Sequence, residues 1–256
     1  EAAMTDLLSN GRLEFGIGSG AYQREFDRMH PGLKQSDGWL YMQEMLPAIL
    51  ALWQGDYEHT GEYWSFPLST SVPKPLQNPH PPIWVAARSP MTFDFAIKND
   101  CNIMSWPLTR PMSEAELYKS QLDEAIRENP ECKSPIFAMM RHACVYDHTD
   151  SWEVPVKAAQ RQLGQFENLF KNLGDVSNGF SQSVDLDLIA NRDEYDPKML
   201  HDNLLFGTPD EVIDKLRLYE EIGVDEFIYY ASLGLEHKEQ LRSMQLFINE
   251  VMPAFR

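Results

Sequence analysis

The chain has 256 residues, of which 43% are hydrophobic, so it can bury a sizeable core within one large domain or two small ones. Its formal net charge of −17 argues against nucleic acid or an anionic membrane surface as the main partner, because both require basic patches. Its apolar runs are all shorter than the ~18 residues that a membrane-spanning helix needs, so we expect no membrane span.

The first third of the chain predicts a helix, a short strand, a long helix and an aromatic-rich excursion. Alanine, methionine and leucine residues over 2–8 are typical of a helix that is already under way. A strand is expected at about Leu13 to Gly18. A long amphipathic helix should follow over 37–55, with a kink at Pro47. Turn residues between aromatic arms then predict an irregular excursion or a small hairpin over 56–66.

From residue 83 onwards, strand patterns alternate with amphipathic helix patterns. The expected strands cover 83–87, 101–106, 136–146, 204–207 and 224–232. Helices are expected to begin near Thr92, Ser113, Trp152, Thr208 and Glu236. The helix start near Thr208 is marked most strongly, because Pro209 suits the first helical position and Glu211 can complete a capping box.

Strands that alternate with helices imply parallel βαβ units. About six units are recognisable, whereas a closed (β/α)8 barrel needs eight. We therefore predict an α/β fold with one domain over residues 1–256. It would be a TIM barrel that lacks its first two or three strand-helix units in this chain, and an open doubly wound sheet is the structural alternative.

Residues 174–191 form a connection that is longer than usual and rich in glycine and serine. They are a candidate lid. An ordinary surface insertion or a partner-facing loop would show the same pattern.

The cysteines and histidines indicate no metal site. Cys101, Cys132 and Cys144 lack the short spacings of metal ligands, and the histidines form no H-x-x-x-H pair. We expect reduced, mostly structural thiols in a cytoplasmic protein. The first ten residues have the pattern of neither a signal peptide nor a transit peptide.

The segment GIGSGA places glycines at positions 16, 18 and 20, directly after the first predicted strand. It matches a dinucleotide-binding fingerprint, but the region near Asp37 begins a helix where that fold needs the end of a strand. The pattern therefore does not predict a Rossmann site. Because glycine has no side chain, these residues either allow close packing at the end of a barrel strand or let a ligand lie against it.

Four segments, 7–26, 46–66, 73–96 and 207–230, together resemble the bacterial luciferase-like flavin monooxygenases, in particular the luciferase α subunit. The resemblance implies a (β/α)8 barrel that binds reduced FMN delivered by a separate flavin reductase. Such an enzyme uses O2 to insert one oxygen atom into a small organic substrate. The resemblance also implies a homodimer or a heterodimer.

The flavin-contacting positions that the resemblance implies lie at successive strand ends. They are Gly18, Ser19, Tyr22, Ala87, Ser89, Thr92, Ser105 and Trp106, and we add Arg88, at which this chain departs from the family. Aromatic residues at strand ends are also common in cores, so packing is the alternative for Trp106 and Tyr22.

A phosphate site near Ser89 and Thr92 has physical support of its own. Both lie at a strand-to-helix turn, with Pro90 at a first helical position, where unpaired N–H groups and the helix dipole favour an anion. An ordinary N-cap without a ligand is the alternative. The luciferase α chain has arginine in place of Ser19 and glutamate in place of Arg88. We infer that Arg88 supplies the cation here, unless it is a solvated arginine on the rim.

The sequence nominates no catalytic acid or base. His142, near the middle of a predicted strand, is most simply a satisfied core histidine, and Glu44, Glu58 and Glu62 are most simply solvated carboxylates.

Three functional interpretations stay open. The first is an FMN-dependent monooxygenase, which the segments GIGSGAY and IMSW favour. The second is an oxidoreductase that transfers hydride with coenzyme F420, and the third is a non-catalytic flavin-binding or partner subunit. The substrate cannot be read from the sequence.

Overall fold

The computed structural model describes residues 1–171, 175–182 and 192–255, and its centre is a parallel sheet of six strands. The order is β1 (Phe15–Ile17), β4 (Ile83–Ala86), β5 (Asn102–Ser105), β6 (Phe137–Val145) and β10 (Glu226–Tyr230), and β9 (Leu205–Gly207) also pairs with β6. Every pairing in this sheet is parallel. The α/β class and the parallel strands are therefore confirmed.

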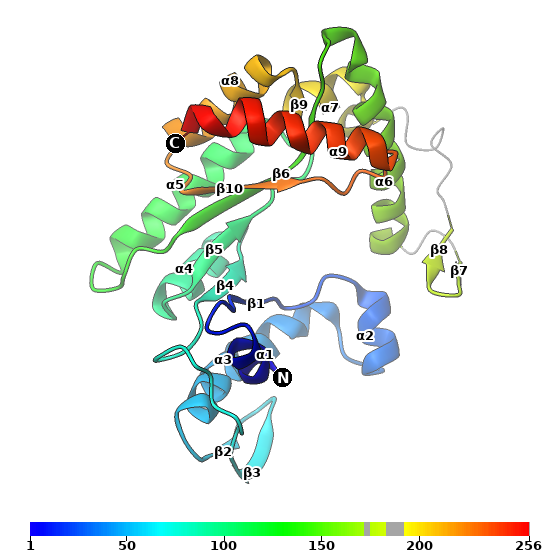
Figure 1. The fold of residues 1–256 in the computed structure, drawn as a ribbon. Coiled ribbons are helices and arrows are strands. Elements are labelled where there is room, and N and C mark those ends of the chain that lie inside the picture. The colour runs from blue at the N-terminus through cyan, green and yellow to red at the C-terminus, as the bar shows by residue number, and fades with distance from the viewer. Residues whose placement is uncertain (172–174, 183–191, 256) are drawn as a thin grey trace.

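The sheet is open in the described part of the chain. No described strand joins β1 to β10, which are the two ends of the strand order. Its register brings the carboxyl ends of the strands to one edge: Ile17 lies opposite Val85, Ser105 opposite Met139, and Tyr230 opposite His142. Figure 1 shows these strands in the middle of the molecule, with helices packed around them.

Nine α-helices occur in the described residues. They are α1 (Ala2–Leu8), α2 (Gln23–Met29), α3 (Gly38–Gln54), α4 (Pro90–Lys98), α5 (Met112–Glu128), α6 (Glu153–Lys171), α7 (Pro197–Asn203), α8 (Pro209–Glu221) and α9 (His237–Leu246). Shorter helical turns cover Gln35–Asp37, Thr149–Trp152, Asp193–Tyr195, Phe247–Val251 and Met252–Phe255. The start of α8 has the predicted capping box, in which the Glu211 carboxylate accepts from the Thr208 backbone N–H at 2.8 Å.

Two small hairpins extend from this framework. The strands β2 (Tyr57–Thr60) and β3 (Ser65–Ser69) form the predicted hairpin after α3, and β7 (Val176–Ser177) pairs with β8 (Phe180–Ser181) beyond α6 (Figure 1). The candidate lid over 174–191 includes the second hairpin, while Gly174 and residues 183–191 lie outside the described residues.

Glu44 is not a solvated carboxylate, contrary to the sequence interpretation. Its side chain is 18% exposed and accepts a hydrogen bond from His59 Nε2 at 2.8 Å. It also accepts from the backbone N–H groups of Glu62, Tyr63 and Trp64 at 2.8–3.1 Å. Burial opposes ionisation, but these four donors outweigh it and lower the Glu44 pKa to about 2. The carboxylate therefore fastens the β2–β3 turn to α3.

Two apolar clusters support the sheet. The larger lies between the strands and helices α3, α4, α5 and α8, and includes Phe93, Ile103, Phe137 and Leu205. The smaller surrounds the end of β6 and helices α6 and α7, and includes Tyr146, Leu163 and Phe206. Together they cover one face of the sheet, the face that carries Ile83, Val85 and Ile103, while Trp84 and Met104 on the alternate positions are only partly buried.

The three cysteines are free thiols, and Cys101 and Cys144 are buried, as expected for structural residues. Within the described ranges, no group of three or more histidine, cysteine, aspartate or glutamate side chains could hold a metal ion. In the same residues, no helix is long and apolar enough to cross a membrane.

Candidate functional site

The glycines after β1 serve different purposes. Gly20 is required by the backbone, because its φ is +81° and a Cβ there would lie 2.6 Å from the Phe26 ring. Gly18 has no such constraint, since a Cβ there would meet nothing within 4 Å. Open space therefore lies beside the end of β1, next to Ser19 and the predicted flavin contact Tyr22.

Ser89 and Thr92 form the cap of α4. Their hydroxyl oxygens are 3.1 Å apart, and Thr92 Oγ1 donates to the Ser89 carbonyl at 2.9 Å. The same Thr92 oxygen accepts from the N–H groups of Arg88 and Ser89 at 3.2 and 3.1 Å. The Thr92 proton is thus used inside the cap. Pro90 has no N–H, and those of Thr92 and Phe93 already donate to the Ser89 carbonyl at 3.0 and 3.1 Å. An anion bound here would therefore rely mainly on the Ser89 hydroxyl and the exposed Arg88 side chain.

Ser105 joins two strand ends. Its side chain is fully buried, and its hydroxyl donates to the Ala87 carbonyl at 2.6 Å. This bond fixes the end of β5 against the end of β4. It therefore holds the following residue, Trp106, at the carboxyl edge of the sheet.

Trp106 lies in a cluster of aromatic rings contributed by three strands. The His142 imidazole stacks on Tyr230 with centroids 4.4 Å apart and planes 18° from parallel. Trp106 meets both rings edge-on, at 5.5 Å from His142 and 5.6 Å from Tyr230. Tyr22 lies close by: its pKa is raised by burial, by Glu25 and by Tyr230.

This aromatic cluster contains polar atoms that the described residues leave unsatisfied. His142 is fully buried, yet neither of its ring nitrogens has a hydrogen-bond partner there, and the buried Trp106 Nε1 also lacks one. Such groups are rare in native proteins and point to an absent partner. The sequence interpretation of His142 is therefore wrong in one respect: the side chain belongs to the core but is not satisfied. Burial and the adjacent Arg141 lower its pKa to about 4, so it is neutral at pH 7.

Arg141 is a structural feature of the site that sequence reasoning missed. Its guanidinium is fully buried, and it donates to the Tyr219 hydroxyl at 2.7 Å and to the carbonyls of Leu108 and Arg110 at 2.9 and 2.8 Å. The loop after Trp106 is therefore tied to β6. The signal in the sequence is the polar pair Arg141–His142 inside an otherwise apolar strand.

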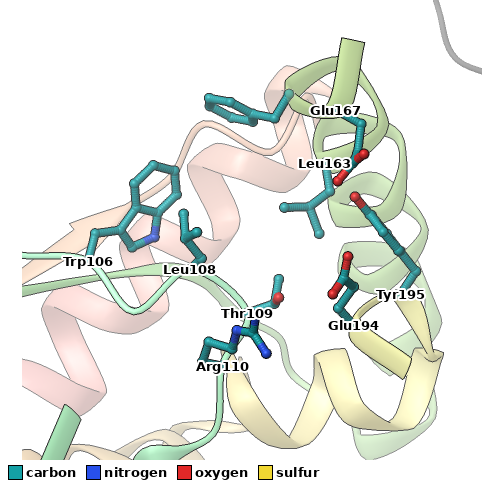
Figure 2. A pocket seen from close by; sticks show the side chains of 9 residues that line it. Trp106, Leu108, Thr109, Arg110, Leu163, Glu167, Glu194 and Tyr195 are labelled. Carbon is teal, nitrogen blue, oxygen red and sulfur yellow. The ribbon is translucent and has the colours of Figure 1, made fainter. Parts of the chain in front are cut away.

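A cavity of about 150 Å³ opens beside Trp106 (Figure 2). It is bounded by the loop after β5, by α6 and by the turn before α7. The lining residues are Trp106, Leu108, Thr109, Arg110, Leu163, Phe166, Glu167, Glu194 and Tyr195. In Figure 2 Trp106 and Leu108 face Leu163 and Tyr195 across the space.

The charges around this cavity are unevenly distributed. Glu167 Oε2 forms an ion pair with Arg192 Nη1 at 3.0 Å, and Glu194 Oε1 lies 3.8 Å from the same nitrogen. Burial and Glu167 raise the pKa of Tyr195, which keeps that phenol protonated. In the described residues, Arg110 forms no ion pair within 4 Å, and its side chain lies on the same side of the cavity as Glu194 (Figure 2).

Comparisons with known proteins agree with this arrangement. The sequence model of the family described as luciferase-like monooxygenase matches residues 1–226. The oxygenase component of a flavin-dependent trigonelline monooxygenase from Acinetobacter baylyi is 40% identical over 255 residues, covering 100% of this chain and 71% of that protein. An FMNH2-dependent dimethylsulfone monooxygenase from Pseudomonas putida is 24% identical, covering 100% of this chain and 69% of that one.

The fold also resembles solved structures. The crystal structure of the monooxygenase RslO1 from Streptomyces bottropensis superimposes with a TM-score of 0.74 and 23% identity, covering 99% of this chain and 72% of that one. At this identity the similarity concerns the fold alone.

Proposed function

Because this chain belongs to the luciferase-like monooxygenase family, we propose that it is the oxygenase component of a two-component system that receives reduced FMN from a separate flavin reductase. The aromatic cluster carries this proposal most directly. Three buried ring nitrogens of Trp106 and His142 lack partners in the described residues, at the edge where a parallel sheet of this type keeps its site. A bound flavin and its substrate would supply the missing contacts.

The residues at the strand ends fit FMN. Gly18, Ser19 and Tyr22 would border the ring beside the open space at the end of β1, and Ala87 and Ser105 would fix the neighbouring strand ends. The phosphate would be held at the start of α4. Its partners there would be the Arg88 guanidinium and the Ser89 hydroxyl, with Thr92 shaping the turn.

Reduced FMN supplies the electrons that activate O2, so that one oxygen atom enters the substrate and the other leaves as water. The described side chains would bind the flavin, orient the substrate and shield both from water. Trp106 and Tyr230 form apolar walls that exclude water from the reacting atoms. Neutral His142 can donate one hydrogen bond and accept another beside them.

The finer expectations belong to the same proposal. The six parallel strands would be part of a (β/α)8 barrel with one domain, and the protein would form a homodimer or heterodimer. Trigonelline, the N-methyl betaine of nicotinic acid, becomes a candidate substrate through the relative that is named for it.

An anaerobic titration with reduced FMN tests the proposal. We expect saturable binding, followed by reoxidation after mixing with air-saturated buffer at a rate that differs from that of free FMN. Binding of reduced F420 in place of FMN would indicate hydride transfer without oxygen. Binding of neither would favour a non-catalytic subunit.

A further inference from the structure

The loop after Trp106 makes a tight turn whose backbone does not suit the residue that it carries. The turn runs from Pro107 to Arg110 and is closed by the Arg110 N–H, which donates to the Pro107 carbonyl at 2.9 Å. Leu108, its second residue, has a φ of +55°. Glycine, asparagine or aspartate normally occupies this position, because a positive φ brings a Cβ too close to the following carbonyl oxygen. Leu108 is therefore strained.

Leu108 differs from the other residues that share this backbone conformation. Across the described ranges, the remaining non-glycine residues with positive φ are Asn10, Asp100 and Asn178. Asparagine and aspartate tolerate a positive φ, since their short polar side chains can hydrogen-bond to the local backbone. A leucine side chain offers no such compensation, so the strain at Leu108 must be offset by something else.

Hydrogen bonds from two other elements hold the strained turn in place. The buried Arg141 guanidinium on β6 donates to the carbonyls of Leu108 and Arg110 at 2.9 and 2.8 Å. The Asn203 amide, at the end of α7, donates to the Thr109 carbonyl between them at 2.9 Å. Three successive carbonyls are thus fixed from outside the loop, and a strained residue persists in a folded protein where its surroundings fix it in this way.

The turn places the Leu108 side chain in a wall of the cavity beside Trp106. The cavity measures about 150 Å³, and Leu108 faces Leu163 and Tyr195 across it (Figure 2). A glycine in the turn would relieve the strain but would leave this part of the wall open. Strained residues that their surroundings hold in place cluster at ligand-binding sites, where the strain contributes to function.

We propose that Leu108 is a size-selecting residue of the oxygenase, held in its strained turn by Arg141 and Asn203 so that its side chain limits the cavity beside Trp106. The cavity then admits a small ligand and rejects one that needs the space of the leucine side chain. The inference rests on the proposed monooxygenase function, which makes this cavity part of the substrate site, and it adds a residue that governs substrate size.

Thermal unfolding distinguishes a strained wall residue from ordinary packing. Leu108→Gly should melt within ~2 °C of wild type or above it, because relief of strain offsets the loss of the side chain. Leu163→Ala, on the opposite wall in helix α6, should melt ~5 °C or more below wild type, because it removes buried contacts without relieving strain. Asp100→Gly is the matched backbone control, since it replaces a positive-φ residue outside the cavity lining.

Ligand-observed NMR titration with phenol and 2-naphthol measures the size limit, under anaerobic conditions with and without reduced FMN. Both probes are flat and largely apolar, like the aromatic lining, and they differ by one fused ring. Relative to phenol, 2-naphthol should bind Leu108→Gly at least ~10-fold more tightly than it binds wild type. Leu108→Met, which restores an apolar side chain of similar volume, should return this ratio to that of wild type, and Asp100→Gly should leave the ratio unchanged.

The inference fails if the ratio of the two affinities is the same in Leu108→Gly and wild type, including the case in which neither protein binds either probe. It also fails if Leu108→Gly melts as far below wild type as Leu163→Ala does, because the leucine would then be ordinary core packing. Titration of the same samples with reduced FMN tests the proposed function separately. A wild type that binds no reduced FMN would contradict the monooxygenase function, while the measurements on Leu108 would still decide its role in the cavity.

Discussion

His142 combines full burial with two ring nitrogens that lack partners in the described residues. A polar group in this state costs stability, on the order of 1–3 kcal/mol, and a hydrocarbon ring in its place would avoid that cost. Its retention between Trp106 and Tyr230 is therefore better explained by a ligand than by packing. The same burial makes His142 a measurable source of pH dependence.

We expect stability to fall as the pH drops from about 6.5 to about 4 because of His142. Its pKa is lowered to about 4 in the folded protein, so in this range only the unfolded state binds the proton. The contribution of His142 to the free energy of unfolding is fully present above pH 6.5 and decreases by about 3 kcal/mol towards pH 4. Denaturant unfolding at several pH values measures it. The difference between wild type and His142→Phe isolates this residue, and parallel curves for the two proteins would contradict the prediction.

Arg88 gives a second prediction about a single residue. Arg88→Ala should weaken reduced FMN binding ~10-fold or more, because a phosphate held at the start of α4 would lose the Arg88 guanidinium. Riboflavin, which has no phosphate, should bind the variant and the wild type equally. Fluorescence or absorbance titration with both flavins checks this. Equal FMN affinity in the two proteins would remove Arg88 from the site.

At the scale of elements, the loop between β5 and α5 depends on one residue of the neighbouring strand. Arg141 on β6 donates to the carbonyls of Leu108 and Arg110, which line the cavity beside Trp106. Arg141→Met would leave those carbonyls and the Tyr219 hydroxyl without a donor. We expect a loss of about 2–5 kcal/mol in the free energy of unfolding.

The same variant should loosen the loop more than the sheet. Hydrogen exchange should increase over 107–111 while the amides of β6 stay protected until global unfolding. Lys119→Met, which removes a partly exposed cation on α5, is a control for loss of charge alone. A protection pattern in Arg141→Met that rises uniformly along the chain would show that the residue supports the core in general.

The elements themselves were largely predictable from the sequence, whereas their assembly at the site was not. Alternating and helical periodicities are local, so the strands around Ile103 and Phe137 and the cap at Thr208 were all recognisable. The stacking of His142 on Tyr230 depends on the register between β6 and β10, which no local pattern encodes. Glu44 was missed for a similar reason, because its four donors come from a hairpin that follows α3.

At the scale of the whole molecule, the family resemblance predicted the protein family, whereas the strand count predicted only the fold class. Six parallel strands were predicted and found, and the four resembling segments led to the family that the comparisons then showed. The cavity beside Trp106 was beyond reach, because Trp106, Phe166 and Tyr195 come from three separate segments. Only the folded chain places them around one space.

The net charge of −17 makes a last prediction about the whole molecule. Reduced FMN carries a doubly charged phosphate, so the chain as a whole repels it while Arg88 attracts it locally. Salt shortens the Debye length from about 30 Å at 10 mM to about 8 Å at 150 mM, which screens distant carboxylates more than a direct contact. The association rate of reduced FMN should therefore rise about 2- to 5-fold over this range.

Stopped-flow mixing at several salt concentrations measures this association rate. Riboflavin, being uncharged, should associate at a constant rate, and Arg88→Ala should show a steeper rise than wild type. A rate that falls with salt would mean that the local field of Arg88 governs the encounter, and that the negative charge is arranged away from the site.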